Sequence, residues 1–377
     1  MSQADLRQPA SLSDSPHGPV ALIASPHAGS AHGEHPQALL ERAGVPVALS
    51  LPVDALDIRE PQGQRWRDAG CVAAVAAGGD GTVGAVATHA VAADLPLGIL
   101  PLGTANDVAR ALGIPLTPAA AAAVIAQGEP RAIDAGQAIP ARTQPHAAAQ
   151  ETTPGPTTLT GALASESDDS PASGAAYFLH ALTLGLNVEF ARRATDAEQR
   201  RQWGRLTYLA SAIESLERLR PIAVKLSFAG MAGAAEEDIV VVQSETALFT
   251  AINLPVFGGR LGLRVPGVRT DDRLLDFILI EAPDPRGARA ALEAALEGLT
   301  RTAQTLWAAQ HPASQPAGLA LPGARWFRAR AVEIETEQPV ELTLDGELRG
   351  RTPAVARVAP SAVRVIVPRG QGLASTG

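Results

Sequence analysis

The chain has 377 residues, of which 46% are hydrophobic, 19% are charged and only 3% are aromatic, and its formal net charge is −8. This length predicts two domains of ordinary size, and the composition excludes a fibrous protein. No run of about 20 apolar residues is present, so no membrane span is expected, and the acidic balance argues against broad nucleic-acid binding.

Cysteine and lysine are almost absent from the chain. Cys71 is the only cysteine, which excludes an intrachain disulfide and fits a reducing cytosol. Of the 31 basic residues, Lys225 is the only lysine. No GxxxxGK[ST] segment and no VAIK-type strand lysine occur, which excludes the P-loop and protein-kinase designs. The N-terminus also lacks the basic and apolar regions of an export signal, so we expect a cytoplasmic protein.

The first part of the chain alternates between strands and helices. Residues 1–17 are expected to form a disordered leader. Apolar strands are predicted after Val20, within 71–78 and within 95–101; glycine turns follow them, and helical segments are predicted at 83–93 and 106–114. This order predicts βαβ units, and therefore an α/β domain with a parallel sheet over residues 18–128.

The rest of the chain predicts a β-rich domain over residues 129–368. Residues 140–175 are rich in Pro, Ser, Thr, Ala and Gly, and we expect a disordered insertion there. Helices are expected at 195–220 and 284–310. The tail, 361–377, is expected to pack back on the first domain. Strands are predicted at 131–139, 177–190, 223–228, 238–244, 247–253, 260–267, 274–282, 327–337, 339–347 and 362–368.

The most informative segment is Gly-Gly-Asp-Gly-Thr at 78–82, directly between a strand and a helix. Its glycines let the backbone approach a ligand closely, and the N–H groups of a helix N-terminus attract anions without a lysine. The segment therefore predicts a phosphate-binding turn. The alternative is a tight structural turn in which Thr82 merely caps the helix.

A second turn of the same kind lies at 101–107, Pro-Leu-Gly-Thr-Ala-Asn-Asp. In a parallel sheet both turns would lie at the carboxyl ends of strands, where open α/β sheets bind ligands. Asn106 or Asp107 acting only as a helix N-cap is compatible with this hypothesis.

A third segment, Leu-Asp-Gly-Glu at 344–347, favours a hairpin turn, because Asp-Gly is a common hairpin dipeptide. The functional interpretation is that one of its carboxylates accepts the proton of a substrate hydroxyl that attacks a γ-phosphate. A carboxylate supplied by the second domain would place that reaction between the domains.

These three segments, in this order, resemble the diacylglycerol kinase catalytic-domain family, which includes bacterial lipid kinases and sphingosine kinases. Weaker matches are Ser-Pro-His-Ala-Gly at 25–29, Ile-Asp at 133–134, Trp-Gly-Arg-Leu-Thr-Tyr at 203–208, and the Gly-Gly pair at 258–259 together with Asp-Arg-Leu at 272–274. The resemblance implies an α/β nucleotide-binding domain and a β-rich lipid-binding domain, with the active site in the cleft between them.

The resemblance also implies roles for single residues. Glu347 matches the proposed general base, with Asp345 beside it. Asp80, Asp107 and Asp134 match acidic positions that organise a catalytic Mg²⁺ through water. A structural Mg²⁺ in the second domain would map near Arg269, Asp272 and Leu274, whose oxygen atoms suit that hard cation. The implied ATP contacts are Gly29, Gly79, Asp80, Gly81, Thr82, Gly103, Thr104 and Asn106.

The chain departs from the family pattern at three places. Gly84-Ala85 stands where the family usually has Asn-Glu, which removes two polar groups expected near the nucleotide. Ser25 replaces the Asn of the first turn, and Arg273 replaces a Gly in the segment of the structural Mg²⁺. The three Asp positions and the two carboxylates of 345–347 remain, so we expect an active kinase.

The expected reaction is the ATP- and Mg²⁺-dependent phosphorylation of a lipid hydroxyl, in lipid metabolism and phospholipid biosynthesis, at the inner face of the membrane. Arginines clustered between 192 and 205 would attract anionic headgroups, or would form a solvated helix face paired with Asp196 and Glu198. A homodimer is compatible with this interpretation. Two alternatives are an NAD kinase, although no Thr-Gly-Ser-Thr-Ala-Tyr-like stretch is present, and a non-catalytic nucleotide- or lipid-binding protein.

Overall fold

The computed structural model describes residues 18–26, 35–57, 62–140, 175–185, 221–235, 238–257, 263–265, 267–281 and 324–370. The helices expected at 195–220 and 284–310, the arginine cluster, and most of the 140–175 insertion lie outside these residues. Within them, none of the helices is both long and apolar enough to cross a bilayer.

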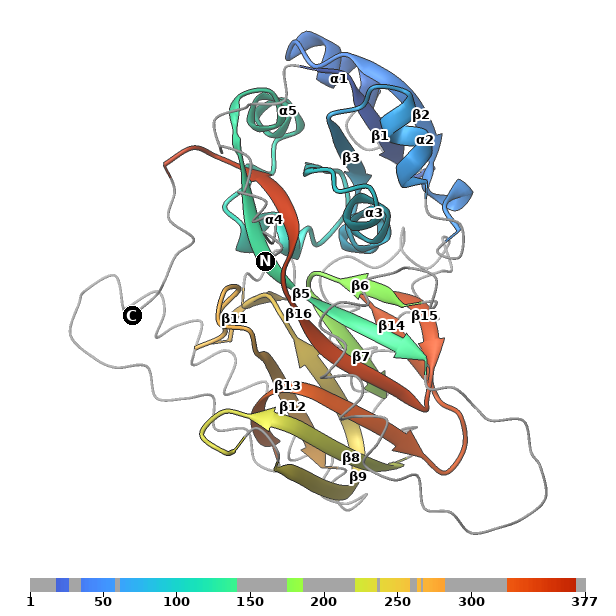
Figure 1. The fold of residues 1–377 in the computed structure, drawn as a ribbon, viewed down its shortest axis with the longest axis vertical. Coiled ribbons are helices and arrows are strands. Elements are labelled where there is room, and N and C mark those ends of the chain that lie inside the picture. The colour runs from blue at the N-terminus through green and yellow to red at the C-terminus, as the bar shows by residue number, and fades with distance from the viewer. Residues whose placement is uncertain are drawn as a thin grey trace, which may run out of the picture.

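The first lobe, residues 18–128, is a parallel sheet covered by helices (Figure 1). Its strands are β1 (Val20–Ala24), β2 (Val47–Pro52), β3 (Ala73–Gly78) and β4 (Leu97–Pro101). They pair in the order β2-β1-β3-β4, and each pair is parallel. The helical segments are α1 (Pro36–Arg42), η1 (Val53–Ala55), α2 (Gly63–Asp68), α3 (Asp80–Ala92), α4 (Asp107–Ala111) and α5 (Pro118–Gln127).

The second lobe, which follows residue 128, consists of antiparallel strands in its described part (Figure 1). Its core is apolar and includes the stacked or edge-on rings of Phe228, Phe249 and Phe277. Its strands are β5 (Glu129–Pro140), β6 (Ala176–Phe178), β7 (Ala181–Gly185), β8 (Ile222–Met231), β9 (Ile239–Ile252), β10 (Val256–Phe257), β11 (Leu263–Arg264), β12 (Leu275–Glu281), β13 (Ala324–Thr336), β14 (Glu341–Leu344), β15 (Glu347–Arg351) and β16 (Ala354–Val367). An α/β lobe followed by a β-rich lobe confirms the fold class that the sequence predicts.

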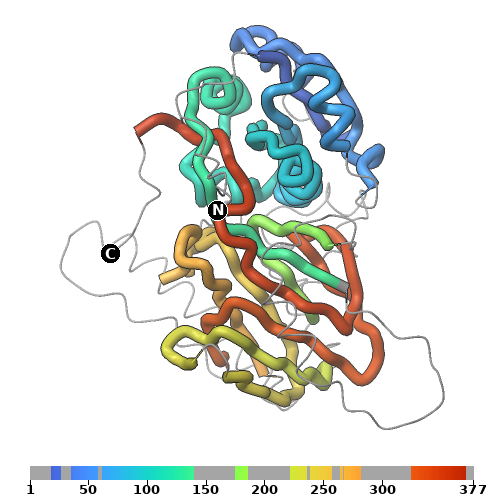
Figure 2. Tube along the Cα trace, in the orientation of Figure 1, coloured from blue at the N-terminus to red at the C-terminus, as the bar shows by residue number. Residues whose placement is uncertain are grey.

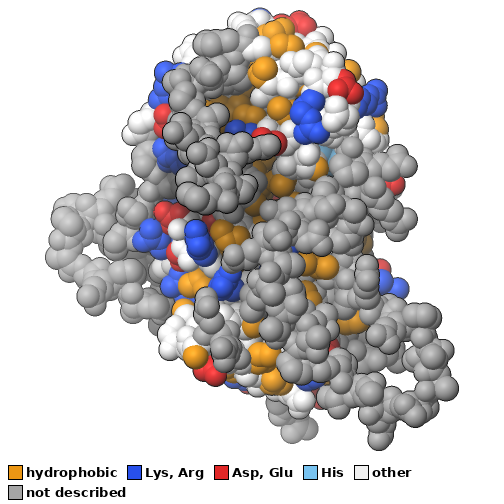
Figure 3. Space-filling model, viewed as in Figure 1, with side chains coloured by type: hydrophobic (Ala, Val, Ile, Leu, Met, Phe, Trp, Pro, Cys, Tyr) orange, Lys and Arg blue, Asp and Glu red, His pale blue; other side chains and the backbone are white. Residues whose placement is uncertain are grey.

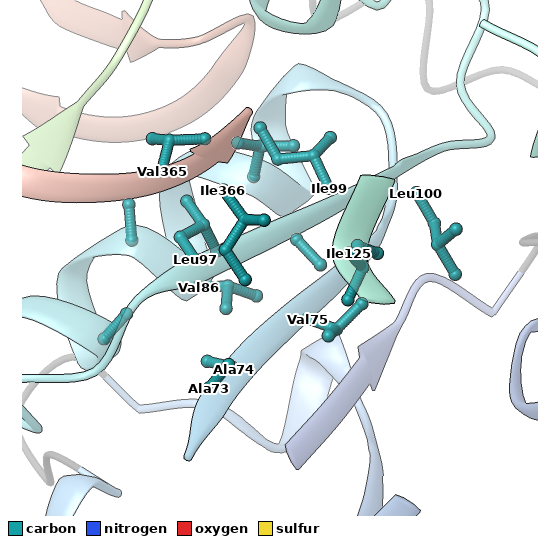
Figure 4. Packing of buried hydrophobic residues seen from close by; sticks show 14 of the residues in the cluster. Ala73, Ala74, Val75, Val86, Leu97, Ile99, Leu100, Ile125, Val365 and Ile366 are labelled. Atoms are coloured by element: carbon teal, nitrogen blue, oxygen red, sulfur yellow. The ribbon is translucent and has the colours of Figure 1, made fainter. Parts of the chain in front are cut away.

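Two long strands join the lobes. β5 and β16 pair side by side across the junction, with an irregularity between Ala359 and Val363, as the green and red tubes of Figure 2 show. The far end of β16 extends the parallel sheet, because Val365 pairs with Leu97 of β4. Val365 and Ile366 therefore pack into the core of the first lobe beside Leu97 and Ile125 (Figure 4). One continuous sheet of 14 strands thus runs through the described parts of both lobes.

Several predicted strand boundaries are wrong. β16 begins at Ala354 rather than at residue 362, and the strand expected over 339–347 is interrupted by a turn at 345–346. The strand expected over 177–190 is broken after Phe178, because the backbone N–H groups of the next residues turn toward a buried carboxylate, described below. The strands expected at 238–244 and 247–253 are one strand, β9. Its polar centre is not a turn, since Thr246 is fully buried and its hydroxyl donates to the Leu248 and Ile280 carbonyls.

A buried histidine lies on α3, packed against α2. The side chain of His89 is 3% exposed, contacts the Trp66 ring, and accepts a hydrogen bond from the Gln62 N–H at Nδ1. The pKa of His89 is lowered to about 4, chiefly because the imidazole is buried and also because of Arg349 of the second lobe, while Asp57 opposes the shift. The imidazole is therefore neutral in the folded protein at neutral pH.

We expect the wild type to lose stability relative to a His89→Gln variant as the pH falls. Protonation of His89 is unfavourable in the folded state but not in the unfolded state. The contribution of the neutral imidazole to stability is therefore complete above the unfolded pKa of about 6.5 and is lost as the pH falls toward 4. From pH 7.5 to pH 5 the unfolding free energy of the wild type should fall by about 2 kcal/mol relative to that of His89→Gln. Urea unfolding of both proteins at these pH values measures it, and a difference that does not change with pH would contradict the assignment.

Candidate active site at the junction of the lobes

The two glycine turns meet at the carboxyl edge of the parallel sheet. β3 and β4 are neighbours, and Gly78 pairs with Pro101 at their ends. The N–H groups of Leu102 and Gly103 both donate to the Gly78 carbonyl, at 2.9 and 3.2 Å. A Cβ on Gly103 would lie 2.4 Å from the Cα of Gly79, so only glycine allows this approach.

Two polar side chains hold the turns in this position. Asn106, in a left-handed conformation, accepts the Gly103 N–H at its Oδ1 and donates from Nδ2 to the Gly103 carbonyl. Asp80 of the first turn accepts the N–H groups of Asp107 and Val108, at 3.1 and 2.9 Å. The first turn thus caps the helix that begins in the second turn, where a negative charge is favourable. Thr104 lies exposed between them.

A hairpin of the second lobe reaches the first turn of α3. Asp345 and Gly346 both have positive φ, +50° and +87°, and link β14 to β15 by a two-residue turn that pairs Leu344 with Glu347. A Cβ on Gly81 would lie 2.2 Å from the Cγ of Glu347. The Glu347 side chain therefore extends over the N-terminus of α3, beside the Gly-Gly-Asp-Gly-Thr segment.

Asp345 is placed differently from Glu347. It is 6% exposed, and its carboxylate accepts the backbone N–H groups of Leu179, His180 and Ala181 at 2.8–3.0 Å. Burial raises the pKa of Asp345 to about 6, against the lowering effects of His180 and of these three N–H donors. The carboxylate ties the hairpin to the β6–β7 turn, whereas Glu347 is exposed at the surface of the junction.

One face of α3 receives the second lobe. Gly81, Gly84 and Thr88 follow helical spacing, so they lie on one side of the helix. A Cβ on Gly84 would lie 2.4 Å from Asp345 Oδ2, and the Thr88 hydroxyl accepts the Tyr177 N–H of β6 at 3.1 Å. Position 84 therefore faces Asp345, and the Gly that departs from the family pattern leaves the space that this carboxylate fills.

Asp134 lies on the joining strand β5 and is 2% exposed. Its two carboxylate oxygens accept the N–H groups of Ser361 and Arg273, at 2.8 and 2.7 Å. Both donors have positive φ. Asn253, fully buried, donates to the Asp134 and Leu179 carbonyls. Asp134 therefore fixes the crossing strand β16 and the 270–274 loop at the junction.

Family models and individual relatives both relate this chain to the diacylglycerol kinase family. The model of the diacylglycerol kinase catalytic domain matches residues 19–138, and that of the YegS C-terminal NAD kinase beta sandwich-like domain matches residues 314–367. A relative in Stenotrophomonas maltophilia (strain K279a), named Probable lipid kinase YegS-like, is 30% identical over 318 residues, covering 80% of this chain and 81% of the relative. The chain belongs to the diacylglycerol kinase catalytic-domain family.

Two further comparisons show lower identity over most of the chain. The Diacylglycerol kinase of Mycobacterium tuberculosis (strain H37Rv) is 27% identical over 361 residues, covering 93% of this chain and 96% of that protein. The crystal structure of a diacylglycerol kinase from Bacillus anthracis (str. Sterne) has a TM-score of 0.54 at 19% identity, with 93% of this chain and 97% of that chain covered. At this identity the structural likeness establishes the fold alone.

The structure brings most of the predicted site residues of this kinase-family chain together. Gly79, Asp80, Gly81, Thr82, Gly103, Thr104, Asn106 and Asp107 lie on the two adjoining turns and the helices that begin there, with Asp345 and Glu347 opposite. Gly29 lies outside the described residues. Arg269, Asp272 and Leu274 belong to the loop of residues 269–274, which contacts the junction through Asp134.

The carboxylates of Asp80, Asp134 and Asp345 each accept backbone N–H groups. Within the residues that the structure describes, no three His, Cys, Asp or Glu side chains are grouped to hold a metal ion directly. A catalytic Mg²⁺ would have to take phosphate oxygens and water as its nearest ligands, with Asp80, Asp107 and Asp134 acting through that water. Such an ion would neutralise phosphate charge, and the described part of the chain does not provide a direct binding site for it.

The sequence did not reveal three residues that shape the site. Asn253 directly follows the apolar end of β9, and Ser361 interrupts the apolar strand β16; a polar residue at such a position is the signal that could have singled them out. The third is Gly84, which the family pattern marked as a loss of polar groups. Its part in the structure is steric.

Gly84→Ala should destabilise the protein by about 1–3 kcal/mol, because the added methyl overlaps the Asp345 carboxylate. The sign is diagnostic, since Ala in an open helix interior would stabilise by up to about 1 kcal/mol. Urea unfolding gives the values. In the double variant Gly84→Ala/Asp345→Ala, the loss of unfolding free energy should be smaller than the sum of the two single losses by about 0.5–3 kcal/mol.

The matched control is Gly350→Ala on β15, where an added methyl meets nothing within 4 Å and φ is not positive. It should change stability little. A stabilising Gly84→Ala, or strictly additive effects with Asp345→Ala, would show that position 84 does not face Asp345 in solution.

Proposed function

We propose that the chain is an ATP-dependent lipid kinase that transfers the γ-phosphate to the hydroxyl of a diacylglycerol-like lipid. The family is that of a kinase, and the relatives are named as lipid and diacylglycerol kinases. The observation that carries the proposal is the position of Glu347 over Gly81, which joins a carboxylate of the second lobe to the glycine turns of the first. On this proposal, residues 18–128 bind the nucleotide and residues 129–368 bind the lipid.

The glycine turns would bind the phosphates. The first N–H groups of a helix have no carbonyl partner within it, and the helix dipole adds partial positive charge there. At α3 these groups belong to Asp80, Gly81 and Thr82, with Thr104 on the neighbouring turn. This design needs no lysine, which fits a chain whose only lysine, Lys225, is paired with Glu335 on strand β13.

Glu347 would act on the acceptor. As the lipid hydroxyl oxygen bonds to the γ-phosphorus, the bond from that phosphorus to the bridging oxygen of ADP breaks, and the hydroxyl proton passes to the Glu347 carboxylate. Asp345 would position rather than react, because its oxygens already accept three backbone N–H groups. The lipid would be reached at a membrane surface, at the cytoplasmic face.

Glu347→Gln should lower kcat by about 10²–10⁴ while ATP binding stays the same, since the amide keeps the shape and loses the base. Purified protein is incubated with radiolabelled ATP, Mg²⁺ and, in separate reactions, diacylglycerol, phosphatidylglycerol, sphingosine or NAD, and nucleotide binding is measured by calorimetry. Glu337→Gln, an exposed carboxylate beyond the other end of β14, is the control and should be fully active. Normal turnover by Glu347→Gln would refute the base, and labelled NADP in place of a labelled lipid would refute the lipid acceptor.

Asp345→Asn separates positioning from catalysis. Removing a buried acceptor of three N–H bonds should lower the melting temperature, and activity should fall less than in Glu347→Gln with the pH–rate profile unchanged in shape. Activity assays across pH, together with thermal unfolding, test this. If Asp345→Asn keeps its stability and loses as much kcat as Glu347→Gln, then Asp345 is the base.

A further inference from the structure

The loop of residues 269–274 is held to the rest of the molecule on two sides. On the side of the junction, the Asp134 N–H donates to the Thr270 carbonyl, and the Arg273 N–H donates to Asp134 Oδ2. On the other side, Asp272 contacts the guanidinium of Arg328 through Oδ2. Asp272 Oδ1 accepts the Leu274 N–H at 3.2 Å, which closes the loop on itself.

The position of Arg328 follows from strand pairing. Arg328 lies on β13 directly opposite Asp276 of β12, and its Nε is 3.2 Å from Asp276 Oδ1. Asp276 is 1% exposed, and the same oxygen accepts the Trp326 indole N–H at 2.8 Å. One guanidinium therefore contacts two carboxylates, as a planar group with several donors can. Figure 3 shows basic and acidic side chains side by side on this lobe, close to its junction with the first.

This arrangement is a poor fit for the structural Mg²⁺ that the family resemblance implies at Arg269, Asp272 and Leu274. Mg²⁺ requires oxygen ligands in near-octahedral geometry. A carboxylate whose charge is already neutralised by a guanidinium attracts a second cation less strongly. Here the Asp272 oxygens contact the Arg328 guanidinium and the Leu274 N–H, so the carboxylate of the implied site is already paired with a cation. Asp276 Oδ2 has no hydrogen-bond partner among the described residues, but it is a single buried oxygen.

We infer that the guanidinium of Arg328 takes the place of that divalent ion, so that the 269–274 loop of this chain is held by an internal cation and needs no metal. The positive charge that joins Asp272 to strand β13 is covalently part of the chain. The loop in turn fixes Arg273 against Asp134 at the lobe junction, so Arg328 supports the junction whatever the metal concentration. The inference does not depend on the activity proposed above.

Thermal unfolding of the full chain without nucleotide tests the inference. For the wild type, replacing EDTA by Mg²⁺ should shift the melting temperature by less than about 1 °C through this loop. Arg328→Gln removes the charge and should melt lower, with Mg²⁺ restoring part of the loss. Arg328→Lys keeps a positive charge, so its melting temperature should lie between those of the wild type and Arg328→Gln and should not change with Mg²⁺.

Substitutions of two neighbouring carboxylates on the same loop provide a test and its control. Asp272→Asn removes the proposed partner of Arg328, and Asp271→Asn removes an exposed one. If Mg²⁺ shifts the melting temperature of the wild type at all, the same shift should persist in both variants. Calorimetric titration with Mg²⁺ should likewise show no loss of binding in either variant. A Mg²⁺ response that Asp272→Asn or Asp276→Asn abolishes and Asp271→Asn retains would overturn the inference, even if Arg328→Gln does not fold.

Discussion

The junction depends on one face of α3 that has almost no side chains. At Gly81 and Gly84 the helix backbone lies within contact distance of Glu347 and Asp345, and one turn further the Thr88 hydroxyl binds the backbone of β6. A larger residue at either glycine would hold the second lobe away from the N-terminus of the helix. The closeness of Glu347 to the glycine turns, on which the proposed chemistry rests, follows from this contact.

Three carboxylates at the junction, half-buried Asp80 and buried Asp134 and Asp345, organise the backbone around them. Asp80, Asp134 and Asp345 each accept two or three N–H groups from segments distant in the sequence. Such charge-assisted hydrogen bonds are strong, and they offset the cost of burying a charge. They also fix residues in uncommon conformations, including Arg273 and Ser361. Asp80, Asp134 and Asp345 therefore hold the junction together, whereas Glu347 is exposed and free to meet a substrate.

The use of arginine in place of lysine has a structural counterpart in the second lobe. Arg328 contacts two carboxylates with one guanidinium, and buried Arg357 donates to Gln137 across the paired strands β16 and β5. A planar group with several donors can connect strands in this way, whereas an ammonium group acts as a single point charge. Arginine side chains thus connect strands of the second lobe, whereas the proposed phosphate site relies on backbone N–H groups.

The sequence by itself determined the class of fold, the two glycine turns and the hairpin of residues 344–347, because strand periodicity, glycine and Asp-Gly turns are local properties. It could not decide that strand 177–190 breaks, since the cause is Asp345, a residue far along the chain. Nor could it show that Gly84 leaves room for that carboxylate, or that Arg328 lies between Asp272 and Asp276. These features depend on which strands pair and how closely the lobes approach, and only the tertiary structure decided those contacts.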